Sequence, residues 1–147
     1  MEIRFKKLSD VEHELTVVRS DGSLENRVRD NRSFLRHDLA HLAVEMEVPI
    51  RLGYWGSVAK GAALDGMSIR GPDIGTAERL SVMVQGLMRQ ESEDPAQFYA
   101  VLHPLKDGIV TRDIATRICA RCRELRGHWR ATAFGNTMVL QWPEPPA

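Results

Sequence analysis

The stretch Ser33–Met46, SFLRHDLAHLAVEM, combines the clearest amphipathic pattern of the chain with its densest group of metal-ligating side chains. At about 100° per residue, Leu35, Leu39 and Leu42 fall on one narrow stripe together with Met46. This is the spacing of a helix that packs one side on a hydrophobic core. We therefore expect the central helix of the fold here, and Pro49 is expected to end it.

One flank of this predicted helix carries polar side chains that can bind metal. His37, His41 and Glu45 follow one another at intervals of four residues, and Asp38 lies in the same sector. Two histidines one helical turn apart can bind the same divalent ion through their neutral ring nitrogens. The pattern predicts a metal site with His37 and His41 as ligands, Glu45 as the third ligand and zinc as the expected ion.

The segment His37-Asp38-Leu39-Ala40-His41 resembles the HExxH helix of zinc metallopeptidases. In that family two histidines bind zinc, and the glutamate between them activates a water molecule. The resemblance implies that His37 and His41 bind zinc and that Asp38 is the catalytic residue, although its side chain is one methylene shorter than glutamate. Asp38 is accordingly expected to be a weak general base or a hydrogen-bonding partner of a ligand.

The five-residue match leaves the third ligand open. Glu45 follows on the same helix, and His103 or His128 could supply the ligand from elsewhere in the fold. Three protein ligands leave one coordination position for water, so a metal-dependent hydrolase of unspecified substrate is the predicted function. The HDLxH helix, with Phe34 before it and Tyr54-Trp55-Gly56 after it, also resembles small bacterial proteins with no established activity.

A second interpretation of the histidines needs no metal. A histidine beside an apolar stripe is often hydrogen-bonded to a neighbouring carboxylate and has only a structural role. The chain would then be a non-enzymatic binding or assembly protein that uses its helical layer or its basic last helix. This alternative predicts a small-molecule or protein partner, or a homo-oligomer.

The composition is that of an ordinary globular protein. The chain has 147 residues, of which 43% are hydrophobic and 27% charged, and its formal net charge is zero. Zero net charge gives no reason to expect nucleic acid or an anionic membrane as partner. We expect one soluble domain at residues 1–142 and a loose, proline-rich tail at 143–147. The N-terminus lacks a signal-peptide pattern and no segment has the length of a membrane helix, so a cytoplasmic location is expected.

Residues 2–29 predict a three-stranded antiparallel meander. Apolar and polar residues alternate, and Asp21-Gly22 is a strong signal for a two-residue hairpin turn. With this turn, Val17 faces Asn26 and Leu15 faces Val28. The other face of the third strand would then present Glu25, Arg27 and Arg29 to solvent.

The rest of the chain predicts helices followed by a hairpin. Four or five helices are expected, and their N-terminal ends are Asn31 or Ser33, Leu52, Asp73, Asp94 and Thr111. A C-terminal hairpin is expected at 129–142, turning at Gly135-Asn136. The predicted fold is therefore α+β: an antiparallel sheet, formed by the meander and this hairpin, with the helices on one face.

The last predicted helix is basic. Residues 112–130 contain six arginines but only Asp113 and Glu124 as acidic residues. This surface could contact nucleic acid or an acidic partner. Nucleic-acid binding is not expected, because the acidic segment 91–94 could neutralise the arginines. Cys119 and Cys122 lie in the same helix, and we expect both to be buried packing residues in a reducing compartment.

Overall fold

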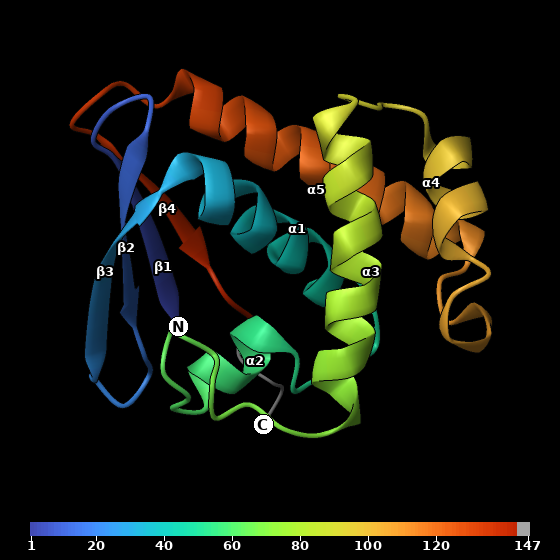
Figure 1. Ribbon diagram of the computed structural model, residues 1–147, viewed down its shortest axis with the longest axis horizontal. Coiled ribbons are helices and arrows are strands. Elements are labelled where there is room, and N and C mark those ends of the chain that lie inside the picture. The colour runs from blue at the N-terminus through green and yellow to red at the C-terminus, as the bar shows by residue number, and fades with distance from the viewer. Residues whose placement is uncertain (144–147) are drawn as a thin grey trace.

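The computed structural model describes residues 1–143 and confirms the α+β fold. Within these residues, a four-stranded antiparallel sheet in the order β3-β2-β1-β4 has five α-helices on one side, with α3 and α4 farthest from the strands (Figure 1). The strands are β1 (Glu2–Lys7), β2 (Glu12–Val18), β3 (Leu24–Asp30) and β4 (Thr137–Gln141). The helices are α1 (Arg36–Glu45), α2 (Tyr54–Ala59), α3 (Pro72–Arg89), α4 (Pro95–Leu102) and α5 (Arg112–Ala131). The predicted tail at 143–147 lies outside the described residues except for Pro143.

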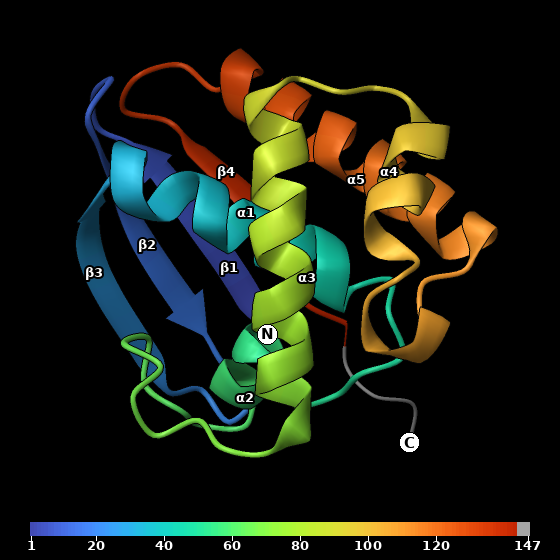
Figure 2. The ribbon, with the colours of Figure 1, turned by 45° about the vertical axis from the view of Figure 1, so that its right-hand side comes forward.

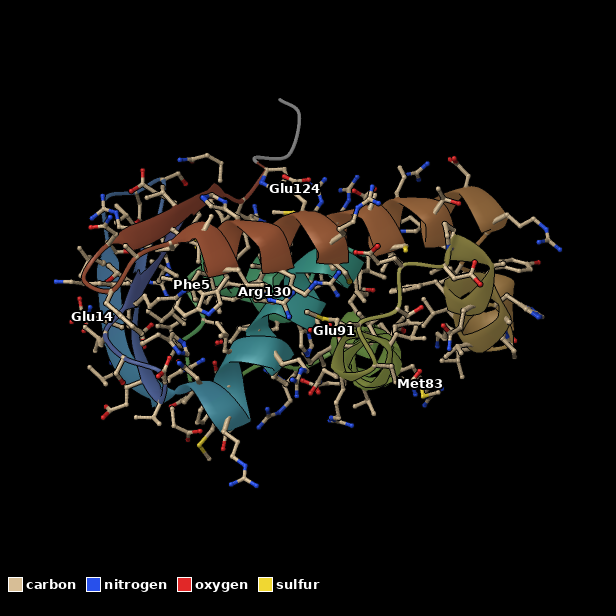
Figure 3. The ribbon with its side chains drawn as sticks, turned by 90° about the horizontal axis from the view of Figure 1, so that it is seen from above. Phe5, Glu14, Met83, Glu91, Glu124 and Arg130 are labelled. Atoms are coloured by element: carbon tan, nitrogen blue, oxygen red, sulfur yellow. The ribbon has the colours of Figure 1, made fainter. Side chains whose placement is uncertain are left out.

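The hydrophobic core lies between the sheet and α1. Ile3 and Phe5 of β1 are fully buried, as are Leu15 and Val17 of β2. Figure 3 shows Phe5 directed from the sheet toward the helices, while Glu14 lies on the opposite, outer side of the sheet. In Figure 2, α1 lies against the sheet and α3 crosses α1 on the side away from it. Helix α1 is therefore enclosed between two layers.

The register between β2 and β3 differs from the prediction by one residue. Val17 lies opposite Glu25, not Asn26. The reason is the turn, in which the Gly22 amide donates to the Arg19 carbonyl (2.9 Å) and the Arg19 amide donates to the Ser23 carbonyl (2.9 Å). This is a three-residue loop closed by a glycine at φ +87°, not a two-residue loop. A shift of one residue moves every side chain of β3 to the other face. The side chains moved to the helix side of the sheet are those of Glu25, Arg27 and Arg29.

The predicted C-terminal hairpin was wrong in its first strand. Helix α5 continues to Ala131, and β4 pairs with β1 instead of with residues 129–134. The last turn of α5 is held by Lys7, whose ammonium group lies 4.7 Å from the centre of the Trp129 ring and donates to the Trp129 carbonyl (2.7 Å). This contact across the fold outweighs the local strand pattern.

The start of the central helix also differs from the prediction. Asp30, not Asn31 or Ser33, caps the segment: its carboxylate accepts a hydrogen bond from the Ser33 amide at 2.7 Å. A five-residue π-helical turn, Asn31–Leu35, then leads directly into α1. The predicted caps of α4 and α5 are confirmed, since the side chain of Asp94 accepts from the Ala96 amide and that of Thr111 from the Ile114 amide.

The arginines of α5 are largely neutralised within the fold, as expected. Arg126 pairs with Glu93 at 2.8 Å, and Arg130 pairs with Glu91 (Figure 3). Glu47 forms ion pairs with two more of these arginines, Arg117 and Arg121.

The two cysteines of α5 are free and buried, which also confirms the prediction. Burial disfavours the thiolate and raises the pKa of Cys122 to about 12. Among residues 1–143, no helix has the length and apolar character that crossing a membrane requires.

His13 is a titratable group enclosed in the core. Its ring is fully buried, 5.7 Å from the Phe5 ring and 6.2 Å from the Trp129 ring between centroids. Nδ1–H donates to the side-chain oxygen of Asn31 at 2.8 Å, while Nε2 has no partner within the described residues. Burial lowers the pKa of His13 from 6.5, although the bond to Asn31 acts in the opposite direction.

We expect His13 to make the protein less stable at mildly acidic pH. The unfolded chain takes up a proton at His13 near pH 6.5, and the folded protein does so only at lower pH. Neutral His13 therefore makes its full contribution to the free energy of unfolding above pH 6.5. Below pH 6.5 this contribution falls, and the free energy of unfolding decreases by up to about 1.4 kcal/mol per pH unit. Urea unfolding between pH 6.5 and 5 should show this slope, and His13→Gln should reduce it. The same substitution at the exposed His103 should leave the slope unchanged; an unaltered slope in His13→Gln would contradict the assignment.

Candidate metal centre

Two histidines of α1 and one glutamate of α3 meet where these helices cross. His37, His41 and Glu78 each place one donor atom so that the three atoms lie within 4.8 Å of one another. His41 Nε2 is 3.4 Å from Glu78 Oε1, and His37 Nε2 is 4.0 Å from Glu78 Oε2. The two imidazole rings are 4.5 Å apart between centroids. The pair at intervals of four predicted from the sequence thus converges on one point.

The opposite edge of each imidazole is bound to a carboxylate. His37 Nδ1 lies 3.0 Å from Asp38 Oδ1, and His41 Nδ1 lies 2.9 Å from Glu45 Oε2. In a neutral ring this contact assigns the proton to Nδ1 and leaves the Nε2 lone pair directed toward Glu78. A carboxylate behind each ring is also what orients histidine ligands in metal sites and raises their basicity.

The centre is closed on the His41 side and open on the Glu78 side. His41 is fully buried, and its Nε2 lies 3.4 Å from Glu78 Oε1 without the geometry of a hydrogen bond to any described residue. The side chains of His37 and Glu78 are 30% and 48% exposed, so solvent reaches the donors from that side. A buried nitrogen with no hydrogen bond, next to an accessible carboxylate, is what a cation would satisfy.

In the metal-free protein a proton can occupy the same place. Burial opposes the charge of His41, but the hydrogen bond with Glu45 and the nearby negative charges of Glu45 and Glu78 outweigh burial and raise the pKa of His41 to about 9. The close approach of the His41 cation in turn lowers the pKa of Glu78. Protonated His41 therefore stabilises the fold fully below pH 6.5, and this contribution is lost as the pH rises through 9. A metal would have to displace this proton.

Glu45 has a different role from the third ligand that the sequence predicted. Besides His41, its carboxylate accepts hydrogen bonds from the backbone amides of Tyr54 (2.9 Å), Trp55 (3.0 Å) and Gly56 (3.3 Å). It is therefore the anion that satisfies the first turn of α2. A Cβ atom at Gly53 would lie 2.5 Å from this carboxylate, which explains the glycine. The position predicted for Glu45 at the centre is taken by Glu78.

Asp38 lies behind His37 and is fully buried. Its second oxygen accepts from Arg29 at 3.0 Å, and its backbone carbonyl accepts from the Trp55 indole at 3.0 Å. Arg29 also donates to the Leu64 carbonyl at 2.7 Å. These contacts hold Asp38 behind the His37 ring and leave neither of its carboxylate oxygens directed toward the open side.

No motif in the sequence points to Glu78 as part of this cluster. Glu78 lies between Ala77 and Leu80 in the sequence. Both of these residues are buried on the apolar face of α3. Glu78 is therefore at the edge of a packing face, where any glutamate would be unremarkable. The crossing of α3 over α1 brings it to the histidines, and no motif spacing encodes that crossing. His103, which stacks on Tyr99 at 4.7 Å, and His128, which is exposed on α5, do not belong to the cluster.

Comparison with known proteins adds no assignment to this geometry. No protein family matches the chain, and neither a curated protein nor a solved structure matches it significantly.

Proposed function

We propose that the protein binds one divalent transition metal through His37 Nε2, His41 Nε2 and the carboxylate of Glu78, and that it is a metal-dependent hydrolase. One observation carries the proposal. Both imidazoles are bound at Nδ1 by carboxylates and turn Nε2 toward a third, accessible carboxylate. Such an arrangement uses both nitrogens of each ring, as metal-binding histidines do.

Zinc is the ion that we expect first. Two histidines and one glutamate form the protein ligand set of several catalytic zinc sites, which keep a further position for water or substrate. The same donors also suit non-haem iron, so the metal has to be identified by analysis. When bound, the ion would supply Lewis acidity and would lower the pKa of water to about 7.

The protein residues would hold and orient these ligands. Glu45 fixes His41 from the buried side, and Asp38 fixes His37. Because Asp38 is paired with Arg29, we assign it a positioning role and not the general-base role that the HExxH resemblance implies. A cleft of about 400 Å³ lies next to the proposed centre and is lined by His37, Tyr54 and Phe34 among others.

The competing explanation is a structural ion cluster without a metal. Protonated His41 would then link Glu45 of α1 to Glu78 of α3, and the chain would be a non-enzymatic binding or assembly protein. Both explanations use the same contacts, but they differ in metal content.

We expect about one equivalent of zinc per chain after tag-free protein is incubated with zinc and desalted, as measured by mass spectrometry. His41→Ala and Glu78→Gln should each bring the content below about a tenth of an equivalent, because two protein donors hold zinc poorly. His103→Ala removes a histidine outside the cluster and should retain the metal. Stoichiometry below a tenth in the unmodified protein, or equal metal content in all four proteins, would reject the site.

A further inference from the structure

A second, larger cleft lies on the other side of α2. It has a volume of about 940 Å³, and its apolar lining includes Met46, Val48, Ile50 and Leu52 after α1, together with Trp142 after β4. The volume is within the range of small-molecule sites, which are mostly apolar with a few polar groups. This cleft is not used by the proposed metal centre.

The wall of this cleft is fixed in place by hydrogen bonds. The Asp73 carboxylate, in the first turn of α3, accepts from the backbone amides of Arg51 (3.0 Å) and Leu52 (2.9 Å). On its inner side the segment packs closely on α2, since a Cβ atom at Gly56 would lie 1.8 Å from the Arg51 carbonyl oxygen. A wall held from both sides needs little ordering when a ligand binds.

Two cationic side chains of the cleft are free to bind an anion. Arg51 and Lys60 line it, and within residues 1–143 neither side chain has an ion-pair partner. Two acidic residues line it as well, but both are already occupied. Glu45 accepts from three backbone amides and His41, and Asp73 accepts from two amides. The lining therefore offers apolar surface and two cationic side chains that have no ion-pair partner within residues 1–143, while its two carboxylates are held in place by backbone amides.

We propose that this cleft binds a small amphipathic carboxylate, with the apolar body against Ile50, Leu52 and Trp142 and the acid group at Arg51 and Lys60. Apolar contact would supply most of the affinity, and the two cations would select the acid over a neutral analogue. The inference is independent of the metal centre.

Calorimetric titration with octanoate and with 1-octanol tests this proposal, because the two probes share an alkyl chain and differ in charge. We expect octanoate to bind at one site more tightly than octanol. The double variant Arg51→Gln/Lys60→Gln should weaken octanoate about tenfold and leave octanol unchanged. Leu52→Ser, at a half-exposed position that the fold should tolerate, should weaken both probes.

Arg89→Gln/Lys106→Gln is the matched control, because it removes the same two charges away from the cleft, and it should bind octanoate normally. His41→Ala should also bind octanoate normally, which separates this test from that of the metal centre. Absence of octanoate binding would overturn the proposal. Equal affinity for acid and alcohol, or an unchanged affinity in Arg51→Gln/Lys60→Gln, would do so as well.

Discussion

Glu45→Ala is expected to lower the free energy of unfolding by about 3–5 kcal/mol, measured by urea unfolding of metal-free protein. The carboxylate is 2% exposed and accepts four hydrogen bonds, three from the first turn of α2 and one from His41. Alanine would leave these donors buried without an acceptor. It would also leave the His41 cation without its buried partner.

Glu78→Ala provides the matched comparison, because Glu78 also faces His41 but its side chain is 48% exposed. Water can replace this carboxylate, so the loss should stay below about 1 kcal/mol. Gly53→Ala tests the same buried site by adding atoms instead of removing them, since the added methyl group would collide with the Glu45 carboxylate. It should destabilise the protein without removing any charge. A loss in Glu45→Ala no larger than in Glu78→Ala would contradict the role of Glu45 as the support of α2.

This role explains why the sequence predicted that His37 and His41 lie together but placed Glu45 beside them instead of Glu78. The pair His37 and His41 depends on helical spacing alone, which the local sequence encodes. The third position depends on which chain segments approach the helix. The amides of α2 reach Glu45 and occupy it, whereas α3 brings Glu78 to the ring nitrogens. Neither approach has a signature in a single sequence.

For the fold, too, the sequence predicted the features that depend on neighbouring residues and missed those that depend on distant contacts. Alternation and caps identified the meander and the starts of α4 and α5, because these depend on neighbouring residues. The end of α5 depends on Lys7, far away in the sequence, which holds Trp129 in helical conformation. The register of β3 depends on the loop closed by Gly22, and the predicted two-residue turn would have placed Arg29 on the solvent face. The ion pair between Arg29 and Asp38 was therefore beyond the prediction.

That ion pair leads to the second large effect. Asp38→Asn is expected to lower the free energy of unfolding by about 3 kcal/mol, because Arg29 is only 10% exposed and would keep a buried charge without its partner. Asparagine retains an oxygen that can accept from His37, so the ring is still held, but by a neutral and weaker partner. Zinc affinity should then fall by about 10- to 100-fold without loss of the one-to-one stoichiometry.

A double-mutant cycle with Arg29→Met separates the two contributions of Asp38. In the Arg29→Met background no buried cation remains to be left unpaired, so Asp38→Asn should cost much less stability than in the natural sequence. The loss of zinc affinity should persist, because it comes from the contact between Asp38 and His37 and not from Arg29. Urea unfolding and competitive zinc titration on the four proteins measure both quantities. If zinc affinity recovered together with stability, Asp38 would support only the fold; if affinity alone stayed low, Asp38 orients the ligand.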